Sequence, residues 1–355
     1  MEKRNYALDS LRGIAAIGIL IWHYQHFFAL GKFSQPFEND LAFFYKFGWI
    51  MVDFFFCLSG FIFYKNYSDK IVSQKISLKF FVILRLSRLY PLMIVTLIIT
   101  CLLNYILLYT QHKFFIYSTN DFTAFFLNIF LLQSGFFNIP SSFNAPAWSI
   151  GIEFWIYLIF FYLAYQSKDK LPYLTLLIAL LSMSNKPPNL GFIVLSPDFI
   201  RGISSFFLGG TSFYIFKSSR KFEVRQQNIF GSIALLIFST AFILCSLKMS
   251  AIPPKGIEYL MSTENLSFVL IAFPALILAF TVSPFLECVL SIKPFQFLGD
   301  ISYSSYLWHV PIQLCIFILI LLFDVPFDLS SKNFFIVTCP LEPYHWLRTS
   351  PVLQG

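Results

Sequence analysis

Ionisable side chains interrupt several long apolar stretches of this sequence, and they are the residues that could perform chemistry. They are Asp9, Arg12, His23, Asp53, Arg85, Arg88, Glu153 and His309. If these stretches are membrane helices, an ionisable group at a helix centre costs about 3 kcal/mol or more, so each one is a candidate for function. Histidine offers proton transfer or covalent catalysis, a carboxylate offers proton transfer, and arginine offers anion binding.

Arg12 and His23 share one helix face if the first apolar stretch is helical. Their separation of eleven residues returns to within about 20° of the same direction, with a rise of roughly 16 Å. A polar path could thus connect a cation near one membrane surface with an imidazole deeper in the bilayer. Alternatively, Arg12 extends to the lipid headgroups and His23 is a hydrogen-bonded core residue.

Arg85 and Arg88 are three residues apart and are therefore neighbours on a helix surface, just before Tyr90 and Pro91. Each guanidinium presents a planar fork of donors that matches phosphate oxygens. The pair is a candidate phosphate site. The alternative is the positively charged flank of a membrane helix, with lipid phosphates as its partners.

Two carboxylates fall within predicted helices. In APAWSIGIEFWIY, Ser149 and Glu153 share a face at four-residue spacing. Glu153 lies at a depth comparable to that of His23, where it could orient an imidazole, stabilise its charge or act as a base; alternatively it partners another buried polar group. Asp53, in VDFFFCLSGF, lies near mid-membrane, and it is either catalytic or a hydrogen-bond partner between packed helices.

A late stretch, DISYSSYLWHVPI, places Ser302, Tyr306 and His309 on one continuous helix face. A stripe of tyrosine and histidine that faces the interior of a bundle would form a polar wall for a substrate. The alternative is anchoring at the membrane interface by Tyr303, Tyr306 and Trp308.

The composition indicates which elements position these residues. The chain has 355 residues, of which 57% are hydrophobic and 12% charged, and its mean hydropathy is +0.70, whereas soluble domains carry about 25% charge. We therefore predict an all-α fold, a polytopic membrane bundle, and exclude soluble, disordered, collagenous and disulfide-scaffold classes. The six cysteines show no CxxC spacing, so neither a metal site nor a disulfide is expected.

About ten stretches reach, or approach, the roughly 17 to 25 apolar residues that a membrane-spanning helix needs. They are Ala7–Leu30, Ala42–Tyr64, Leu89–Tyr109, Ala147–Tyr165, Leu171–Met183, Asp198–Phe216, Asn228–Leu247, Asn265–Ser283, Ile301–Phe323 and a tenth that begins at Phe334. Phe122–Leu132 is too short to cross alone, and we expect it to be interfacial or re-entrant.

The basic residues predict the orientation of these spans. There are 25 Lys and Arg against 18 Asp and Glu, and most of the basic residues lie in the short connections of one side. The positive-inside rule then places the N-terminus in the cytoplasm and, with ten spans, the C-terminus there too. The excess of basic residues therefore reflects topology, and no nucleic-acid partner is expected.

Five motifs resemble the integral-membrane acyltransferase 3 family, bacterial O-acyltransferases that modify cell-surface polysaccharides. They occur in the family's order and are ALDSLRGIAAIGILIWHY, VDFFFCLSGF, RLSRLYP, WSIGIEFWIY and FLGDISYSSYLWHVPI. The first has Arg12 and His23 at the family's Arg-x10-His spacing, and the third has the RxxR pair. Together they extend to about Pro311 and cover nearly the whole chain.

The resemblance implies transfer of an acyl group, usually acetyl, from cytoplasmic acyl-CoA to a hydroxyl of a glycan. The enzyme would be a multi-pass protein of the bacterial inner membrane and would need no metal. His23 would be the catalytic histidine, with Glu153 as a second catalytic candidate. The acyl-CoA site would consist of three arginines, Arg12, Arg85 and Arg88.

The substrate-binding candidates are Asp53, Ser149, Tyr306 and His309. The partners would be a glycan or lipid-linked sugar acceptor and membrane lipid. Because no periplasmic hydrolase-like domain is fused to the chain, either the membrane domain suffices or a separate periplasmic transferase completes the reaction. A different class, a proton-coupled transporter or flippase, would use Asp53, Glu153, His23 and His309 as a proton relay, but we find no internal repeat that favours it.

The C-terminal end departs from the family's pattern. Residues 1–338 form the membrane domain, whereas residues 339–355, CPLEPYHWLRTSPVLQG, are too polar and proline-rich to complete a crossing. A frameshift or truncation near Thr338 would produce this tail. The last helix would then be incomplete, and an inactive family member is the corresponding alternative.

Overall fold

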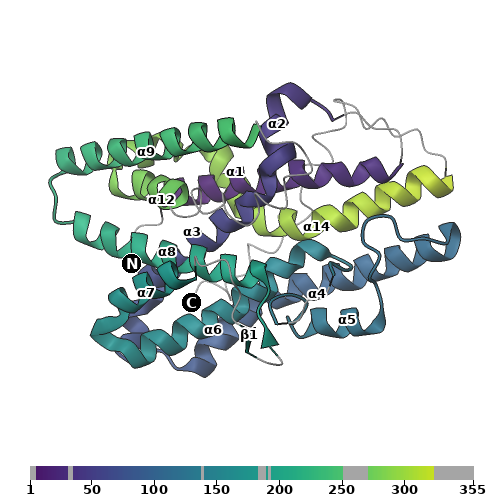
Figure 1. Cartoon of the computed structure of the whole chain (residues 1–355), viewed down its shortest axis with the longest axis horizontal. Helices are drawn as coiled ribbons and strands as arrows, with labels where there is room; N and C mark the ends of the chain where they lie inside the picture. Colours follow the sequence, from purple (N-terminus) through teal and green to yellow (C-terminus); the bar gives the residue numbers. More distant parts are fainter. Residues whose placement is uncertain are drawn as a thin grey trace.

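Helices make up nearly all of the chain that the computed structural model describes, which is residues 5–30, 35–136, 140–182, 189–190, 193–250 and 271–323 (Figure 1). The α-helices are α1 (Tyr6–His23), α2 (Glu38–Phe47), α3 (Met51–Val72), α4 (Leu78–Gln111), α5 (Phe122–Ile129), α6 (Trp148–Ser167), α7 (Leu171–Leu181), α8 (Pro197–Ser219), α9 (Val224–Ser250), α12 (Phe273–Val282), α13 (Pro284–Leu290) and α14 (Lys293–Phe323). Short 3-10 helices are η1 (Tyr24–Leu30), η2 (Gly48–Ile50), η3 (Ala145–Ala147) and η4 (Lys168–Lys170). A two-residue antiparallel ladder joins β1 (Asn189–Leu190) and β2 (Ile193–Val194).

Side-chain caps fix where several helices begin. The Asn5 carboxamide oxygen accepts a hydrogen bond from the Leu8 amide at the start of α1, and Ser77 caps α4 in the same way. Because the cap at Ser77 starts α4 eleven residues before the predicted Leu89, Arg85 and Arg88 lie within a regular helix. Their three-residue spacing therefore places them on neighbouring positions of one surface.

Six helical segments are long and apolar enough to cross a membrane. They are Tyr6–Leu30, Glu38–Val72, Leu78–Gln111, Ala145–Leu181, Val224–Leu244 and Lys293–Phe323. A seventh results if α12 and α13, which meet at a bend of 102°, count as one broken span. The prediction of an α-helical, multi-pass membrane protein is therefore confirmed, and α5 is as short as expected.

The predicted number of ten spans is not reached in the described chain, for three reasons. Ala145–Leu181 is a single candidate where we predicted two, since α7 has only 11 residues and is about 16 Å long. α8 is not among the candidates, because Arg201 and many small polar residues lower its hydropathy. The span from Phe334 and the tail at residues 339–355 lie outside the described residues, as does part of Asn265–Ser283.

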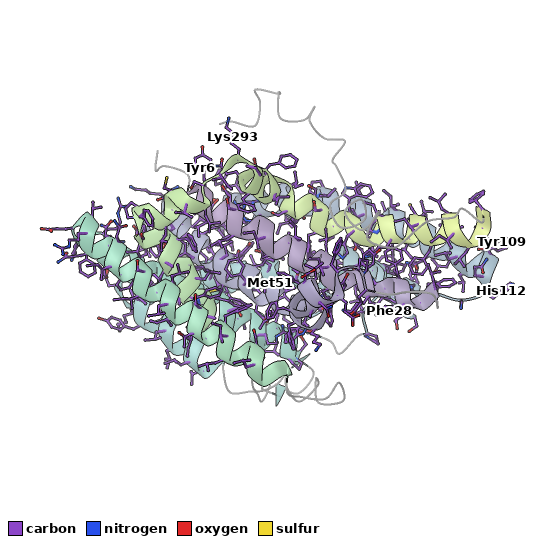
Figure 2. The ribbon with its side chains drawn as sticks, turned by 90° about the horizontal axis from the view of Figure 1, so that it is seen from above. Tyr6, Phe28, Met51, Tyr109, His112 and Lys293 are labelled. Atoms are coloured by element: carbon purple, nitrogen blue, oxygen red, sulfur yellow. The ribbon has the colours of Figure 1, made fainter. Side chains whose placement is uncertain are left out.

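α1 and α14 pack in parallel over much of their length (Figure 1). A Cβ atom on Gly13 would lie only 2.6 Å from the Gly299 amide nitrogen, and one on Gly299 would overlap the carbonyl oxygen of Asp9. Ten residues further along both helices, the His23 and His309 rings are 4.7 Å apart. In Figure 2, Tyr6 and Lys293, where the two helices begin, lie near one another. Glycine therefore sets both the distance and the register of this pair.

α3 and α8 form a second parallel pair. Ion pairs join Asp53 to Arg201 and Asp69 to Lys217, with the same offset of 148 residues. Between them the backbones approach so closely that a Cβ on Gly60 would overlap the carbonyl oxygen of Phe206. Buried aromatic side chains fill the adjoining core, among them Phe61, Tyr64, Phe160, Phe206 and Phe207.

Replacement of Gly299 by alanine should destabilise the fold. The added methyl group would force α14 away from the Asp9 carbonyl, and overpacking of this kind costs about 1–3 kcal/mol. The measurement is thermal unfolding in detergent. Gly151→Ala is the control, because its new methyl group would meet the Gln133 side chain at 3.1 Å, which requires a smaller adjustment. Equal stability of the two variants would contradict the close packing of α1 and α14.

Candidate functional site

A cavity lies among α1, α3, α4, α6 and α14. Its polar lining includes eight residues that the sequence analysis named, Arg12, Arg85, Arg88, Ser149, Glu153, Ser302, Tyr303 and Tyr306. Its remaining walls are largely apolar, with Phe55, Phe56 and Phe63 among them. Three guanidiniums against one carboxylate make this lining net positive, so it suits an anionic ligand with an apolar portion.

The three arginines are held in different ways. Arg85 is buried; it donates to the Tyr67 hydroxyl at 2.7 Å, and its guanidinium lies 5.1 Å from the centre of the Phe63 ring. Arg12 pairs with Asp9 at 3.0 Å. Arg88 lines the cavity without a hydrogen bond or ion pair to any residue of the described chain. Its donors are therefore available to a ligand.

Glu153 lies in the middle of the cavity wall. The Ser59 hydroxyl donates to its Oε1 at 2.7 Å, and the Tyr157 hydroxyl donates a short hydrogen bond to the same oxygen. Ser59 and Tyr157 also contact one another at 2.8 Å. No hydrogen bond in the described chain joins Glu153 to a histidine, so its predicted role beside His23 has no direct contact to support it.

Ser149 and Tyr306 close the other end of the cavity. Their hydroxyl oxygens are 2.9 Å apart, and both residues donate to the carbonyl of Pro146, Tyr306 at 2.7 Å and Ser149 at 3.2 Å. Phe55 lies beside Tyr306, with 6.3 Å between the ring centres. This end therefore carries two hydroxyls between apolar walls.

The order of groups along the cavity follows from two parallel helices, α3 and α6. At one end Phe63 stacks on Tyr157, with 3.8 Å between ring centres, and Arg85 lies over Phe63. At the other end are Ser149 and Tyr306. Glu153 is therefore between the arginines and the Ser149–Tyr306 end, and the two ends are about 12 Å apart along α6.

His23 and His309 meet beyond Tyr306 and are not among the cavity-lining residues. The Tyr306 and His309 rings are 5.9 Å apart. Nδ1 of His23 lies 3.0 Å from the Ile19 carbonyl, and Nδ1 of His309 lies 2.7 Å from the Tyr306 carbonyl. Because a carbonyl only accepts, both Nδ1 atoms carry hydrogen and each Nε2 has a free lone pair. Nε2 of His309 is buried with no partner in the described chain.

His26, Gln313 and Tyr117 surround the histidine pair, and sequence reasoning missed them. The His26 and His23 rings are 5.0 Å apart; Nδ1 of His26 donates to Gln313 at 2.8 Å, and Tyr117 approaches its Nε2 at 3.2 Å. Gln313 in turn donates to the carbonyl of His23 at 3.1 Å. The available signal was spacing, since His26 is one turn from His23 and Gln313 one turn from His309.

A proline in α14 also contributes to the site. Pro311 has no N–H to donate to the Leu307 carbonyl, four residues before it. The Asn144 carboxamide donates to that carbonyl instead, at 2.9 Å. Asn144 lies just before η3, which leads into α6 and Ser149. The bond therefore attaches the start of α6 to α14.

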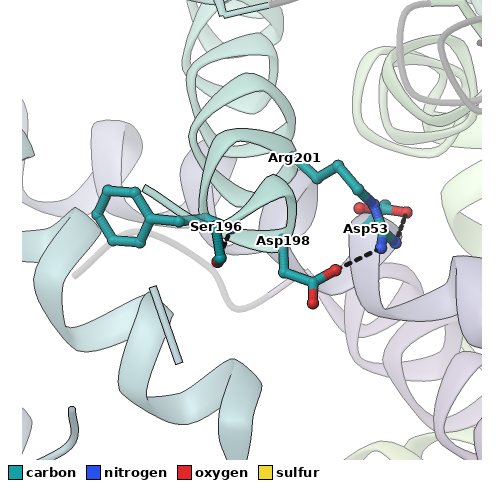
Figure 3. Close-up of polar contacts among 5 residues, drawn as sticks. Asp53, Ser196, Asp198 and Arg201 are labelled. Atoms are coloured by element: carbon teal, nitrogen blue, oxygen red, sulfur yellow. Dashed lines mark hydrogen bonds and ion pairs between the residues drawn. The ribbon is translucent and has the colours of Figure 1, made fainter. Parts of the chain in front are cut away.

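Asp53 is separate from this cavity, and Figure 3 shows its surroundings. Its Oδ2 accepts from Nη2 of Arg201 at 2.7 Å, while Nη1 of Arg201 contacts Asp198 at the same distance. The guanidinium also lies 5.1 Å from the Trp49 ring. Arg201 falls within the predicted span Asp198–Phe216, so a search for ionisable residues in apolar stretches would have found it. The predicted substrate-binding role of Asp53 has no contact with the cavity.

Taken together, the fold and the cavity define a multi-pass α-helical membrane protein with a basic, apolar-walled cavity and, beyond its Tyr306, a histidine pair. In the described chain, no cluster of three or more metal-ligating side chains accompanies them. The model of the acyltransferase domain of the acyltransferase 3 family matches residues 5–341. The chain therefore belongs to the acyltransferase 3 family.

Similarity to individual proteins is more limited. "Protein 2 in picA locus" of Rhizobium radiobacter is 36% identical over 95 residues, which are 27% of this chain. The matched segment covers 43% of that relative's length. No solved structure matches the chain.

Loss of the Arg201 guanidinium should destabilise the protein strongly. Arg201→Leu leaves the Asp53 carboxylate buried without a counter-ion, and breaking a buried pair in this way costs about 3–5 kcal/mol. Arg220→Leu is the control, since Arg220 is exposed. Both are measured by thermal unfolding. If Arg201→Leu unfolds at the same temperature as Arg220→Leu, the ion pair does not stabilise the contact between α3 and α8.

Proposed function

We propose that this protein transfers an acyl group, most simply acetyl, from cytoplasmic acyl-CoA to a hydroxyl of an exported or cell-surface glycan. The observation that carries the proposal is the cavity in which Arg12, Arg85 and Arg88 precede an apolar passage. The passage ends at Ser149 and Tyr306, and the histidine pair follows. Membership of an acyltransferase family supplies the reaction class.

Acyl-CoA fits this arrangement because it combines several phosphates with a long, thin arm that ends in the thioester. Arg85 and Arg88 are placed to hold phosphate oxygens, and Arg88 has no competing partner in the described chain. The arm then extends along the apolar walls. Its thioester would reach Ser149 and Tyr306; because both hydroxyls donate to the Pro146 carbonyl, their oxygens would accept a hydrogen bond from the acceptor hydroxyl.

His23 supplies the proton chemistry in this proposal. With Nδ1 bonded to the Ile19 carbonyl, Nε2 is free to remove the proton of the acceptor hydroxyl. The oxygen attacks the thioester carbonyl, the new C–O bond forms, the C–S bond breaks, and the proton passes to the departing thiolate. Alternatively, Nε2 attacks the thioester carbonyl, the C–N bond forms, and the C–S bond breaks to release the thiolate. The acceptor hydroxyl then attacks the acyl-imidazole, the C–O bond forms, the C–N bond breaks, and the hydroxyl proton passes to the thiolate. His309, whose Nε2 can accept a hydrogen bond, would bind the acceptor beside His23.

The remaining expectations belong to the same proposal. The protein would lie in the bacterial inner membrane with the arginine end of the cavity toward the cytoplasm. Its acceptor would be a glycan or a lipid-linked sugar that reaches the histidine end from the opposite side. A separate periplasmic transferase could complete delivery.

Replacement of His23 by alanine should abolish acyl transfer. Both catalytic routes need its Nε2, and loss of a general base or nucleophile lowers the rate by about 10²–10⁴-fold or more. The assay measures release of CoA from acetyl-CoA by membranes that contain the protein, with crude surface glycan as acceptor. His112→Ala, an exposed histidine after α4, is the control. Full activity of His23→Ala would refute both routes, and no release by folded wild type would favour a transporter.

Arg88→Gln should weaken binding of the donor without blocking chemistry. Loss of a charge-assisted hydrogen bond to phosphate should raise the KM for acetyl-CoA by about 10- to 100-fold, with little change in kcat. A small thioester without phosphate, S-acetyl-N-acetylcysteamine, provides the comparison, because its KM should not change. An equal effect on both donors would show that Arg88 acts on the structure and not on phosphate.

A further inference from the structure

Glu153 is an acceptor of hydrogen bonds in a cavity whose other charged lining residues are arginines. Its Oε1 accepts from Ser59 and Tyr157, which hold the carboxylate in one orientation. None of the ion pairs in the described chain includes Glu153. An ionised carboxylate has about four lone-pair sites, so it can accept further donors. A ligand in this cavity must therefore present an N–H or O–H at Glu153 and keep its phosphates away from it.

The position of Glu153 indicates which part of the donor lies there. Glu153 is one helical turn, about 6 Å, from Ser149 on α6, in the direction of the arginines. In acyl-CoA and every other pantetheine thioester, an amide nitrogen stands two carbons from the thioester sulfur. If the thioester lies at Ser149 and Tyr306, this amide comes level with Glu153.

On the basis of the proposed function, we propose that Glu153, oriented by Ser59 and Tyr157, binds the cysteamine amide N–H of the thioester donor. The subsite recognises the arm and fixes how deeply it enters the cavity. Glu153 is then a donor-binding residue rather than a catalytic base. This role agrees with its contacts, which include two hydroxyls of the cavity wall and no histidine.

A matched pair of small thioesters tests the subsite. S-Acetyl-N-acetylcysteamine has the amide N–H, and the thioacetate of 2-mercaptoethyl acetate has an ester oxygen in its place. Wild type should prefer the amide by about 10-fold in kcat/KM for thiol release, as expected for one hydrogen bond to a charged group. Glu153→Leu should reduce the preference to about one, and Glu153→Gln, which keeps an acceptor oxygen, should retain part of it.

The ratio of kcat/KM for the amide and the ester thioester is measured on one preparation of each variant. It therefore does not depend on the fraction of the protein that is folded. Each thioester is also measured as a competitor of acetyl-CoA, which reports its affinity even if it reacts slowly. Glu223→Gln, at an exposed position before α9, is the matched control and should keep the wild-type ratio.

The outcomes separate this subsite from the proposed function. If wild type releases CoA from acetyl-CoA but treats the amide and the ester alike, the subsite is refuted and acyl transfer stands. A preference that survives in Glu153→Leu also refutes it. A further outcome is that Glu153→Gln loses all transfer while the two thioesters still compete with acetyl-CoA at the same ratio of affinities as in wild type. Glu153 is then a base, contrary to the proposal. Absence of CoA release by folded wild type refutes the proposed function itself.

Discussion

The close parallel packing of α1 and α14 is the constraint on which the rest of the site depends. Gly13 and Gly299 allow the two backbones to touch, and ten residues later the same register brings His23 and His309 together. The same contact directs Arg12 toward the cavity that α14 lines with Tyr306. Two helices that are almost 300 residues apart in sequence thus supply both Arg12 of the cavity and the histidine pair beyond Tyr306.

Some polar groups of the helix bundle have a charged or hydrogen-bonding partner within the described chain, and others have none. Asp53 is neutralised by Arg201 across α3 and α8, as burial in an apolar medium requires. Arg88 and Nε2 of His309, by contrast, have no partner within the described chain. An unsatisfied buried group such as Nε2 of His309 is costly, and a hydrogen bond from a ligand would offset that cost, whereas Arg88 is exposed and its donors can meet a ligand or water.

The sequence predicts the residue types of this site better than their arrangement. Residue type and helical spacing were sufficient to select Arg88, which lines the cavity, and His23, which lies beyond it, because both signals are local. The pairing of Asp53 with Arg201 depends on the contact between α3 and α8, and the hydrogen bond from His26 to Gln313 on the contact between the α1 end and α14. Local spacing can therefore mark these residues as candidates but does not give their partners. Ten spans were predicted for the whole chain, and the described residues hold six or seven candidates, since α6 and α7 form one candidate run and α8 carries Arg201.

Pro311 weakens α14 locally but provides a contact on which the assembly of the site depends. The ring removes one hydrogen bond from α14, and the released Leu307 carbonyl is what Asn144 uses to attach the segment that leads into Ser149. A residue with a normal amide at position 311 would repair the helix and compete with Asn144 for the same oxygen. Selection for a better helix would therefore loosen the attachment of the start of α6 to α14, so the missing hydrogen bond in α14 serves as an attachment point.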